Sequence, residues 1–493
     1  MAKTGNGTAE EHSPSGLPIK QIPGNYGIPV LSPIYDRLHY YYFQGHMGYF
    51  KSHATKNNST VVRLNMPPGI FISRNPHVIA VLDAKSFRVL FDPSKVEKKN
   101  TFTGTYVPPL SLYSGLRPMA YLDTTEQLHS SLKSFSFHLL ASRKSQFIPT
   151  FHKAYSSLFD TVEAKIASGP VEFNGLNQSS AFDFTCNAFL GAVPSEVIGP
   201  SASNKAAIWL LLQLHPLASR LTKFIPWPIE DLLLHCVPLP PCLAHGGYKT
   251  LEEFFSKAGE SLLEDAANKF GLSRDVALHN LIFMTSFNAN AGFKIFMPIL
   301  LKWLAHAGET LHGKLVQEIR SVVKSSNGKI TLDALEKMEL TKSVVWEALR
   351  LDPPVENQFG HARTDLIIES HDTAFRVKKG EMICGYQPLA MRDEKVFKNA
   401  EQFVADRFVG DQGKKLLEYV YWSNGPETVS PTVGNKQCPG KDMVILVGRL
   451  FVAHLFLRYD TFSAVHDGML LGLEPRMVFK SVKKASEVLI SDQ

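Results

Sequence analysis

The sequence predicts a mainly helical fold with small β-sheets, and three observations lead to this class. Apolar residues recur with helical spacing through most of the chain from about residue 125 onward. Short runs of β-branched and aromatic residues appear early and again in the later part of the chain. Hydrophobic residues make up 44% of the 493 positions, with 32 phenylalanines, which is enough material for a large core.

The predicted elements are β-like runs in the early and later parts of the chain and helical stretches from about residue 125 onward. The runs cover residues 61–64, 70–73, 87–91, 366–368, 373–377 and 382–386. Helical periodicity covers 125–142, 146–168, 249–270, 273–301, 308–325, 331–337, 340–351 and 443–457. Because no repeat, low-complexity block or linker breaks this order, we expect a disordered tail at 1–17 and a single domain at 18–493.

Charge and cysteine content narrow the classes of partner and compartment. The chain has 52 Lys and Arg against 46 Asp and Glu, a formal charge of +6 without a basic run, so no nucleic-acid partner is expected. Its five cysteines form no Cys-x-x-Cys pair, which disfavours zinc sites and secreted disulfide frameworks. Residues 1–17 resemble neither a signal peptide nor a clear transit peptide. We therefore expect cytoplasmic residence.

Two apolar stretches raise the question of a membrane. Residues 278–301 are long enough to span one, but Asn288, Lys294 and Pro298 within them favour a helix buried in protein. Residues 226–245 are apolar and broken by prolines. Two interpretations of this second stretch stay open: a peripheral contact with a membrane interface or an apolar substrate, and an ordinary capping loop.

Residues 434–442 carry the clearest chemical signal. Cys438 lies in a glycine-bounded loop with two lysines, directly before the helical pattern at 443–457. Backbone N–H groups at a helix N-terminus and nearby positive charge favour the thiolate form of a cysteine. Such a thiolate could bind a metal or act as a nucleophile, and a buried cysteine in a turn is the alternative.

Two further features define a resemblance together with this loop. Glu347 and Arg350 share one helical face, and Arg407 lies in an Asp-Arg-Phe segment before Cys438. In this order, Glu-x-x-Arg, Asp-Arg-Phe and Gly-x-x-x-Cys-x-Gly resemble the cytochrome P-450 superfamily. The resemblance implies that fold, with haem b between the long central helix and the helix after the cysteine loop. It also implies Cys438 as the axial thiolate and Glu347, Arg350 and Arg407 as a buried charge network behind the haem.

Other segments resemble one plant clan of this superfamily, the allene oxide synthases, hydroperoxide lyases and divinyl ether synthases that metabolise fatty-acid hydroperoxides. These segments are 102–106 (Phe-Thr-Gly-Thr-Tyr), 385–388 (Gly-Tyr-Gln-Pro), 422–428 (Trp-Ser-Asn-Gly-Pro-Glu-Thr) and 435–438 (Asn-Lys-Gln-Cys). The resemblance implies linoleate- or linolenate-derived hydroperoxides as substrates. It also implies that no reductase is required, because such a substrate already carries the O–O bond.

The central helix favours the same chemistry. A monooxygenase needs an acid and a threonine above the haem to deliver protons, whereas this chain has Lys294 and Ile295 there. In the resembling clan the asparagine of the Phe-Asn pair, here Asn288, contacts the hydroperoxide at the haem, and a buried structural asparagine is the alternative. By position in the family pattern, four residues are candidates for haem-propionate contacts, with solvated surface residues as the alternative: Lys98, His129, Lys133 and Lys436.

Three positions bear on the product, and they disagree. Phe102 resembles allene oxide synthases, and its aromatic face can stabilise a neighbouring cationic or radical centre. Ala120 resembles lyases and divinyl ether synthases, and Ala291 before Gly292 resembles divinyl ether synthases. We therefore expect a hydroperoxide dehydratase that forms a divinyl ether, with allene oxide synthase as the alternative. A hydroperoxide lyase and a reductase-dependent monooxygenase rank below both.

Overall fold

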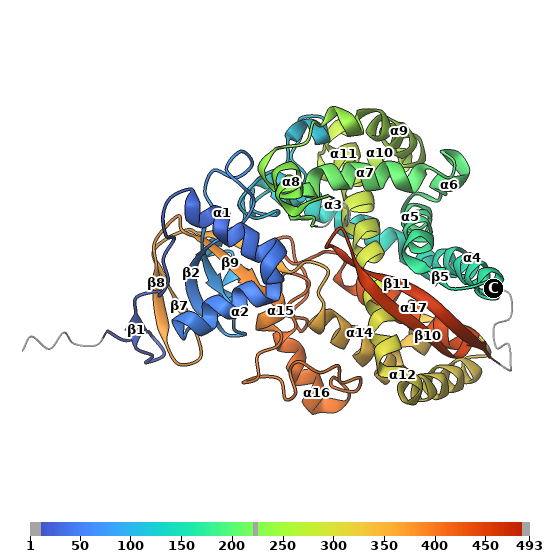
Figure 1. Cartoon of the computed structure of the whole chain (residues 1–493). Coiled ribbons are helices and arrows are strands. Elements are labelled where there is room, and N and C mark those ends of the chain that lie inside the picture. Colours follow the sequence, from blue (N-terminus) through green and yellow to red (C-terminus); the bar gives the residue numbers. More distant parts are fainter. Residues whose placement is uncertain (1–10, 220–224, 486–493) are drawn as a thin grey trace, which may run out of the picture.

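The computed structural model describes residues 11–219 and 225–485, and it has the mainly helical architecture expected (Figure 1). The α-helices are α1 (Leu31–Leu38), α2 (Gly45–Asn57), α3 (Gln127–Arg143), α4 (Phe147–Ile166), α5 (Phe173–Leu190), α6 (Pro194–Val197), α7 (Ala202–Leu214), α8 (Trp227–Asp231), α9 (Cys242–Ala258), α10 (Glu260–Phe270), α11 (Arg274–Ile282), α12 (Ala291–Ser325), α13 (Leu332–Glu336), α14 (Glu339–Leu351), α15 (Gln387–Ala390), α16 (Gly410–Leu416) and α17 (Lys441–Arg458). The strands are β1 (Ile19–Lys20), β2 (Val61–Asn65), β3 (His77–Val81), β4 (Val96–Glu97), β5 (Val171–Glu172), β6 (Asn357–Ala362), β7 (Leu366–Glu369), β8 (Ala374–Val377), β9 (Met382–Tyr386), β10 (Tyr459–Leu470) and β11 (Glu474–Lys484). Short 3-10 or π segments include η1 (His39–Phe43), η2 (Ser86–Phe91), η7 (Leu232–Cys236) and η8 (Phe283–Asn290).

Within the described ranges the strands form three small sheets. The largest has the order β2-β3-β9-β6-β4 and lies beside α1 and α2 (Figure 1). Strand β9 pairs in parallel with β3 and antiparallel with β6, while β4 pairs with β6 through Val96 and Ala362. This pairing joins the N-terminal part of the chain to residues 357–386, and it places Lys98, just after β4, next to Gln358 of β6.

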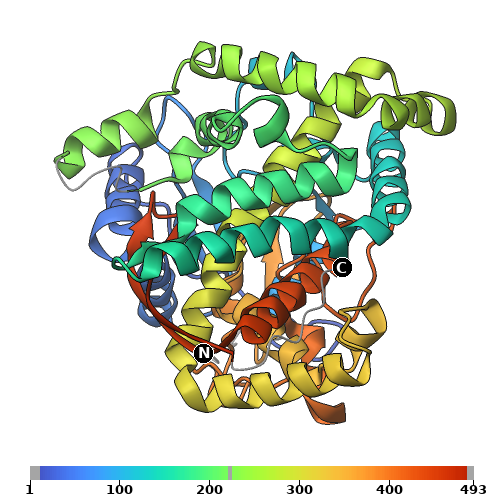
Figure 2. The ribbon, with the colours of Figure 1, turned by 90° about the vertical axis from the view of Figure 1, so that its right-hand side faces the viewer.

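The long helix α12 and helix α17 pack against each other in the interior (Figure 2). Their contact depends on a glycine, because a Cβ at Gly448 of α17 would lie 2.9 Å from Cε1 of Phe296 and 3.0 Å from Cγ1 of Val345. Helix α17 can therefore approach both α12 and α14 closely. Since Cys438 directly precedes α17, this packing fixes the cysteine loop relative to the central helix.

The predicted helix at 273–301 is present, but it has three parts. Helix α11 leads into the π-helix η8, and α12 continues from Ala291 to Ser325. The gap predicted between residues 301 and 308 is a kink, because Gly308 has φ 69° and ψ −165°, outside the helical region. A π-helix is wider than an α-helix and frequently occurs at functional sites.

Most other predicted elements are confirmed, and two β-like runs are wrong. Residues 70–73 form a turn in which the N–H groups of Ile72 and Ser73 donate to the carbonyl of Gly69. Residues 87–91 belong to the 3-10 helix η2, whose start is capped by Asp83: its Oδ1 accepts the N–H groups of Lys85 and Ser86. The alternating pattern of both runs was too short to distinguish a strand from a turn.

Other differences follow from local packing. The predicted helix 249–270 is divided at Gly259, where a Cβ would lie 2.6 Å from the carbonyl oxygen of Phe255. The sequence also predicted none of the N-terminal helices α1 and α2, and it missed the long hairpin β10–β11. In β10 the residues from Ser463 to Leu470 are exposed or half-buried, and in β11 so are those from Lys480 to Lys484, so only short parts of the two strands carry an alternating apolar pattern.

The expected disordered tail at 1–17 is wrong from Glu11 onward, while residues 1–10 lie outside the described part. The N–H of Ile19 donates to the carbonyl of Glu11 over 2.8 Å, and the hydroxyl groups of Ser13 and Ser15 donate to Glu369. These bonds to β7 order a polar segment that carries no apolar signal. That residues 18–493 form a single domain stays a prediction. In the described ranges, no helix combines the length and apolarity that crossing a membrane requires.

Candidate active site

The Cys438 loop is bound to the segment 422–428 by hydrogen bonds. The N–H of Cys438 donates to the carbonyl of Ser423 over 2.8 Å. The side-chain amide of Gln437 donates to Oγ of Ser423 and to the carbonyl of Pro426, over 3.1 and 2.9 Å. Two consecutive residues are thus held by one short segment, and this fixes the direction in which the Cys438 side chain leaves the loop.

The Cys438 thiol is half-buried. Burial raises its pKa, although the backbone N–H of Gly440 and the ammonium of Lys133 act in the opposite direction. The Lys133 ammonium already has two hydrogen-bond acceptors, because its Nζ donates to the carbonyls of Asn435 and Gln437 over 2.9 and 2.5 Å. The sequence predicted a thiolate stabilised by the loop alone. In the structure burial outweighs that effect and raises the pKa, so the loop by itself does not favour the thiolate.

The four predicted propionate contacts are all brought together near this loop, and none is a solvated surface residue. Lys98, His129 and Lys133 are buried, and Lys436 is half-buried. Burial, followed by the charge of Lys436, lowers the pKa of Lys98 to about 7. Burial and Lys133 lower the pKa of Lys436 to about 7, and burial with both of these lysines lowers the pKa of His129 to about 3. The cluster is therefore a concentration of buried basic groups that repel one another.

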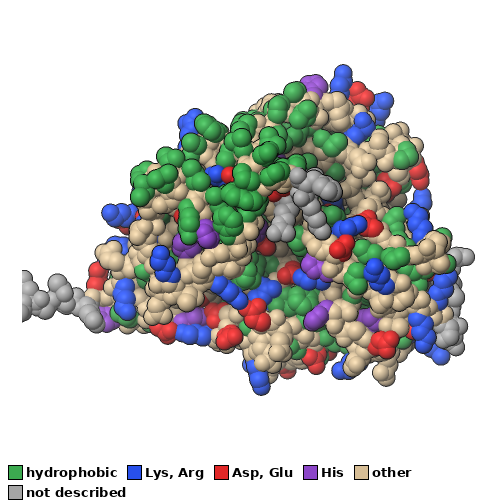
Figure 3. All heavy atoms as spheres, in the orientation of Figure 1, with side chains coloured by type: hydrophobic (Ala, Val, Ile, Leu, Met, Phe, Trp, Pro, Cys, Tyr) green, Lys and Arg blue, Asp and Glu red, His purple; other side chains and the backbone are tan. Residues whose placement is uncertain are grey.

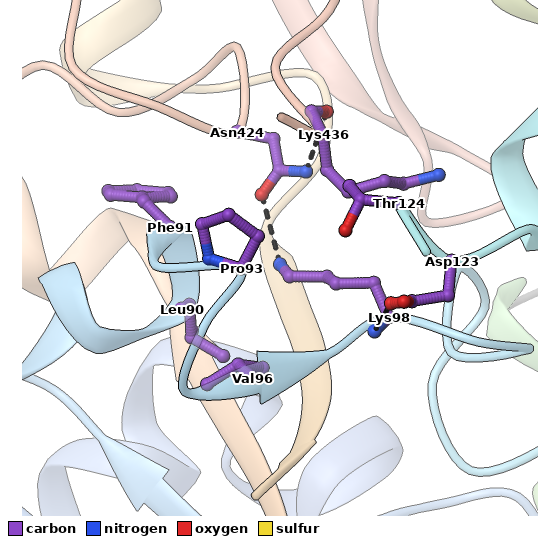
Figure 4. Close-up of a pocket in the computed structure, with 9 residues that line it drawn as sticks. All are labelled: Leu90, Phe91, Pro93, Val96, Lys98, Asp123, Thr124, Asn424 and Lys436. Carbon is purple, nitrogen blue, oxygen red and sulfur yellow. Dashed lines mark hydrogen bonds between the residues drawn. The ribbon is translucent and has the colours of Figure 1, made fainter. Parts of the chain in front are cut away.

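The partners of these basic groups are neutral, which indicates that the cluster fits an anion. Nζ of Lys98 donates to Oδ1 of Asn424 over 3.0 Å, beside a small pocket that Lys436 also lines (Figure 4). Nζ of Lys436 donates to backbone carbonyls, among them that of Leu122 at 2.8 Å. The carboxylate at this pocket, Asp123, is paired with Arg363 at 2.6 Å. Basic groups with neutral partners, next to a thiol, match a group that carries iron and two carboxylates.

Asn288 lies in the π-helix η8 and is exposed, although the residues around it are buried. Phe287 is 7% exposed and Asn290 3%. Within the described part of the chain, the Asn288 amide has no hydrogen-bond partner, which contradicts the alternative of a buried structural asparagine. One turn later, a Cβ on Gly292 would meet no atom within 4 Å. Asn288 and Gly292 thus face open space on the side of an otherwise buried helix.

Phe102 packs against the same helix, whereas Ala291 turns away from the open space. The ring centroid of Phe102 lies 5.6 Å from that of Phe287 and 5.5 Å from that of Tyr121. Ala291 is only 6% exposed, so its methyl group is enclosed by protein. The structure therefore brings Phe102 next to the Phe-Asn pair, but it gives the Ala291 methyl little room to contact a substrate.

The position where a monooxygenase has its acid is occupied by an ion pair. Nζ of Lys294 lies 3.4 Å from Oε1 of Glu474, the first residue of β11. Burial raises the pKa of Glu474, and Lys294 opposes this rise. Sequence reasoning identified Lys294 but missed Glu474, because β11 has no pattern that places it beside the central helix. Since Ile295 stands in the place of the threonine, the pair does not restore a proton relay for O₂ activation.

Glu347, Arg350 and Arg407 form a buried network. Glu347 accepts two bonds from the Arg350 guanidinium, at 2.7 and 2.8 Å, and its Oε1 lies 2.9 Å from Nε of Arg407. Both members of the Glu347–Arg350 pair have fully buried side chains. The remaining guanidinium donors bind backbone carbonyls, among them those of Met391 and Ala400. The network therefore ties α14 to the segment 391–407.

We expect Glu347→Gln to lower the free energy of unfolding by about 3–5 kcal/mol, because it leaves two buried guanidinium groups without a counter-charge. Urea denaturation followed by circular dichroism measures the loss. Glu339→Gln on the same helix is the control, since its pair with Lys414 is more than half exposed on both sides and is worth at most about 1 kcal/mol. Equal stability of the two variants would contradict the role given to the network.

Two further residues join the candidate site that the sequence did not single out. Asn424 accepts from Lys98, and its side-chain amide donates to the carbonyl of Lys436 over 2.9 Å. It has φ 62°, a left-handed conformation that asparagine and glycine adopt readily. Gln437 binds the segment 422–428 through its side-chain amide, next to Cys438. For Asn424 the sequence did offer a signal, the Asn-Gly pair at 424–425, because such a pair marks a tight turn.

The fold and this cysteine site define a haem-thiolate protein. The family model "Cytochrome P450" matches residues 299–484, which include the Glu347–Arg350 pair and the Cys438 loop. Together with relatives that are about half identical along nearly the whole chain, this match shows that the chain belongs to the cytochrome P450 family, whose cofactor is haem with an axial cysteine thiolate. The residues around Cys438 fit this group.

Similarity to named proteins extends over nearly the whole chain. Allene oxide synthase 3 of Oryza sativa subsp. japonica is 53% identical over 492 residues, 98% of this chain and 97% of the relative. Allene oxide synthase 2 of the same plant is 54% identical over 91% of this chain and 94% of its own length. Chloroplastic allene oxide synthase of Arabidopsis thaliana is 51% identical over 95% and 90%. The chain is thus an enzyme, a lyase of the P450 clan of plants that metabolises fatty-acid hydroperoxides.

These relatives correct two expectations. The divinyl ether product is overturned, because proteins about half identical along the whole chain are named allene oxide synthase. The buried methyl group of Ala291 explains why that position was a poor guide to the product. Cytoplasmic residence is overturned as well, since relatives from Arabidopsis thaliana, Solanum lycopersicum and Linum usitatissimum are named chloroplastic.

Proposed function

We propose that this enzyme dehydrates polyunsaturated fatty-acid hydroperoxides to allene oxides without O₂, NADPH or a reductase. The observation that carries the proposal is the 53% identity to an allene oxide synthase over 98% of the chain. The central helix supports the type of reaction, because Ile295 and the Lys294–Glu474 pair replace the groups that a monooxygenase needs. Relatives named chloroplastic extend the proposal to a location in the plastid.

The substrate contributes its own oxidant, the O–O bond of the hydroperoxide. The site therefore has to orient the hydroperoxide and control the loss of one proton from the carbon chain. When bound through Cys438, haem supplies the chemistry that breaks the O–O bond of the hydroperoxide. Asn288 donates its amide N–H to the hydroperoxide and fixes the direction of that bond. The overall reaction removes one water: a hydroxyl from the hydroperoxide and a proton from the carbon chain.

The aromatic and small residues around Asn288 fit a reaction that passes through electron-poor carbon. The face of Phe102 can stabilise positive charge that develops next to the epoxide carbon. Its ring is held against Phe287 at a centroid distance of 5.6 Å, so its position is defined. Gly292 leaves space for the chain of the substrate. Derivatives of linoleate and linolenate are the proposed substrates.

The proposal predicts rapid turnover of a linoleate hydroperoxide by purified enzyme alone. We expect loss of the conjugated-diene absorbance within seconds, with no change when NADPH and a P450 reductase are added. Mass spectrometry of the quenched reaction should detect the α-ketol that forms when an allene oxide reacts with water. A divinyl ether or short aldehydes as main product, or turnover that requires NADPH, would contradict the proposal.

A further inference from the structure

Glu427 is a partly buried carboxylate in the segment 422–428, which binds the Cys438 loop. Its Oε1 accepts the indole N–H of Trp346 over 3.1 Å, and its Oε2 accepts the indole N–H of Trp422 over 3.0 Å. Both tryptophans are only 8% exposed. Each oxygen of one carboxylate therefore has its own indole donor, and the two donors come from parts of the chain that are far apart in sequence.

The Glu427 carboxylate differs from the acidic groups on the surface. Acidic and basic side chains lie interspersed over the lower half of the face shown in Figure 3. In the described part of the chain, no basic side chain forms an ion pair with Glu427, and the nearby Lys441 ammonium donates to the backbone carbonyls of Glu427 and Val429 over 2.7 and 2.9 Å. Burial raises the pKa of the Glu427 carboxyl, and the Lys441 charge and the two indole donors oppose this rise. The carboxylate is therefore a double hydrogen-bond acceptor rather than one half of an ion pair.

The two indole bonds place Glu427 between α14 and the cysteine loop. Trp346 belongs to α14. Trp422 directly precedes Ser423, whose carbonyl accepts the N–H of Cys438 over 2.8 Å. On the C-terminal side of the cysteine, the first residue of α17 donates to the backbone of the same segment. The segment 422–428 thus contacts the chain both at the cysteine and just after it, and Glu427 joins this segment to α14.

We propose that Glu427 is a positioning residue for the axial thiolate of Cys438. Its carboxylate fixes Trp422 relative to α14, and so fixes the neighbouring carbonyl to which the cysteine loop is bound. Two acceptor atoms are required, because an indole N–H only donates. Glutamine has the same length but one acceptor oxygen, so its NH₂ group would face one of the two indole N–H groups. This role concerns the haem-thiolate site and does not depend on the product formed.

Glu427→Gln in the full-length, haem-loaded enzyme tests this role through the spectrum of the carbon monoxide complex. A buried donor left without an acceptor shifts an equilibrium by roughly tenfold. In mild urea we therefore expect the ratio of complex with the thiolate-type Soret band to complex without it to fall roughly tenfold below the wild type. Hydrogen exchange measured by mass spectrometry without urea should be faster by a similar factor at the N–H of Cys438. Glu418→Gln is the matched control, because Glu418 is exposed and pairs with the exposed Arg88.

A second background separates the matching of hydrogen bonds from the loss of a charge. In Trp346→Phe one indole N–H is removed, so an amide in place of the Glu427 carboxylate can accept from Trp422 and its NH₂ group faces no donor. We expect Glu427→Gln to change the thiolate ratio by less than about twofold in this background, against roughly tenfold in the wild type.

Three results would overturn the proposal. The first is a wild-type spectrum and exchange rate in Glu427→Gln. The second is an equal loss of the thiolate-type band in both backgrounds, which would show that the two indole bonds are not what matters. The third is a loss of the band only together with the helical circular dichroism signal, because Glu427 would then stabilise the fold as a whole.

Discussion

Replacing Cys438 by serine is expected to abolish both the thiolate-type Soret band of the carbon monoxide complex and the turnover of hydroperoxide. A serine hydroxyl ionises far less readily than a thiol, and burial raises the pKa even of the Cys438 thiol. The axial ligand would then lose its negative charge and its electron donation to iron. We expect a loss of activity of at least about 1,000-fold. Absorbance spectra and stopped-flow kinetics measure the two effects.

Cys384→Ser is the matched control for this variant. Cys384 is also buried, and its thiol lies 3.9 Å from Oδ1 of Asn357, so a serine hydroxyl there has an acceptor. We expect it to keep the Soret band and most of the activity. If the thiolate band survived in Cys438→Ser, or disappeared in Cys384→Ser, the ligand would have to be assigned to another cysteine.

Asn288→Gln is expected to keep haem and to lose about 100-fold in kcat, in the range found when one positioned hydrogen-bond donor is removed. Asn288 is exposed on a helix whose neighbouring residues are buried, so the longer side chain has room and the fold should tolerate it. Its amide would nevertheless be moved by one methylene from the place where the hydroperoxide is held. Single-turnover kinetics separate this loss from a change in binding.

Asn204→Gln is the control for Asn288→Gln, because it makes the same substitution outside the candidate site. Asn204 is an exposed helical asparagine in α7 that accepts a bond from Gln178 and takes no part in the candidate site. We expect its kinetics to match the wild type. Unchanged kinetics in Asn288→Gln would reduce Asn288 to a structural residue and would remove the main donor from the proposed reaction.

The sequence was most informative where chemistry is local. Cys438, its flanking glycines and the Glu347–Arg350 pair are short motifs that are visible in the sequence, and their order along the chain defined the family resemblance from which their roles were predicted. The basic cluster was also identified, but only through the family pattern, because Lys98 and Lys436 are distant in sequence and meet only in the folded chain. The Asn-Gly pair at 424–425 indicated a tight turn but not its contact with Lys98, and no sequence pattern placed Glu474 beside the central helix.

The product was the least predictable feature for a related reason. The sequence interpretation gave weight to one methyl group at Ala291, but whether a methyl group meets a substrate depends on the rotation of its helix. The structure encloses that methyl group in protein, whereas the neighbouring Gly292 faces open space. A rotation of one residue, about 100° in a helix, decides between the two. The apolar pattern of the eight residues in η8 does not distinguish a π-helix from an α-helix. The rotation of the helix at Ala291 and Gly292 could therefore not be predicted from the sequence.

The wide turn at η8 gives residue count a particular importance in this part of the chain. Phe283–Asn290 holds more residues per turn than the helices on either side of it. The angular relation between Asn288 and the long helix that follows is therefore set by the number of residues wound into the turn, as well as by their identity. Removing one residue between Asn288 and Gly292 would turn the asparagine by about 100° relative to Gly292. For this enzyme, a change of length in that stretch would change the direction of the side chain that we propose to contact the hydroperoxide.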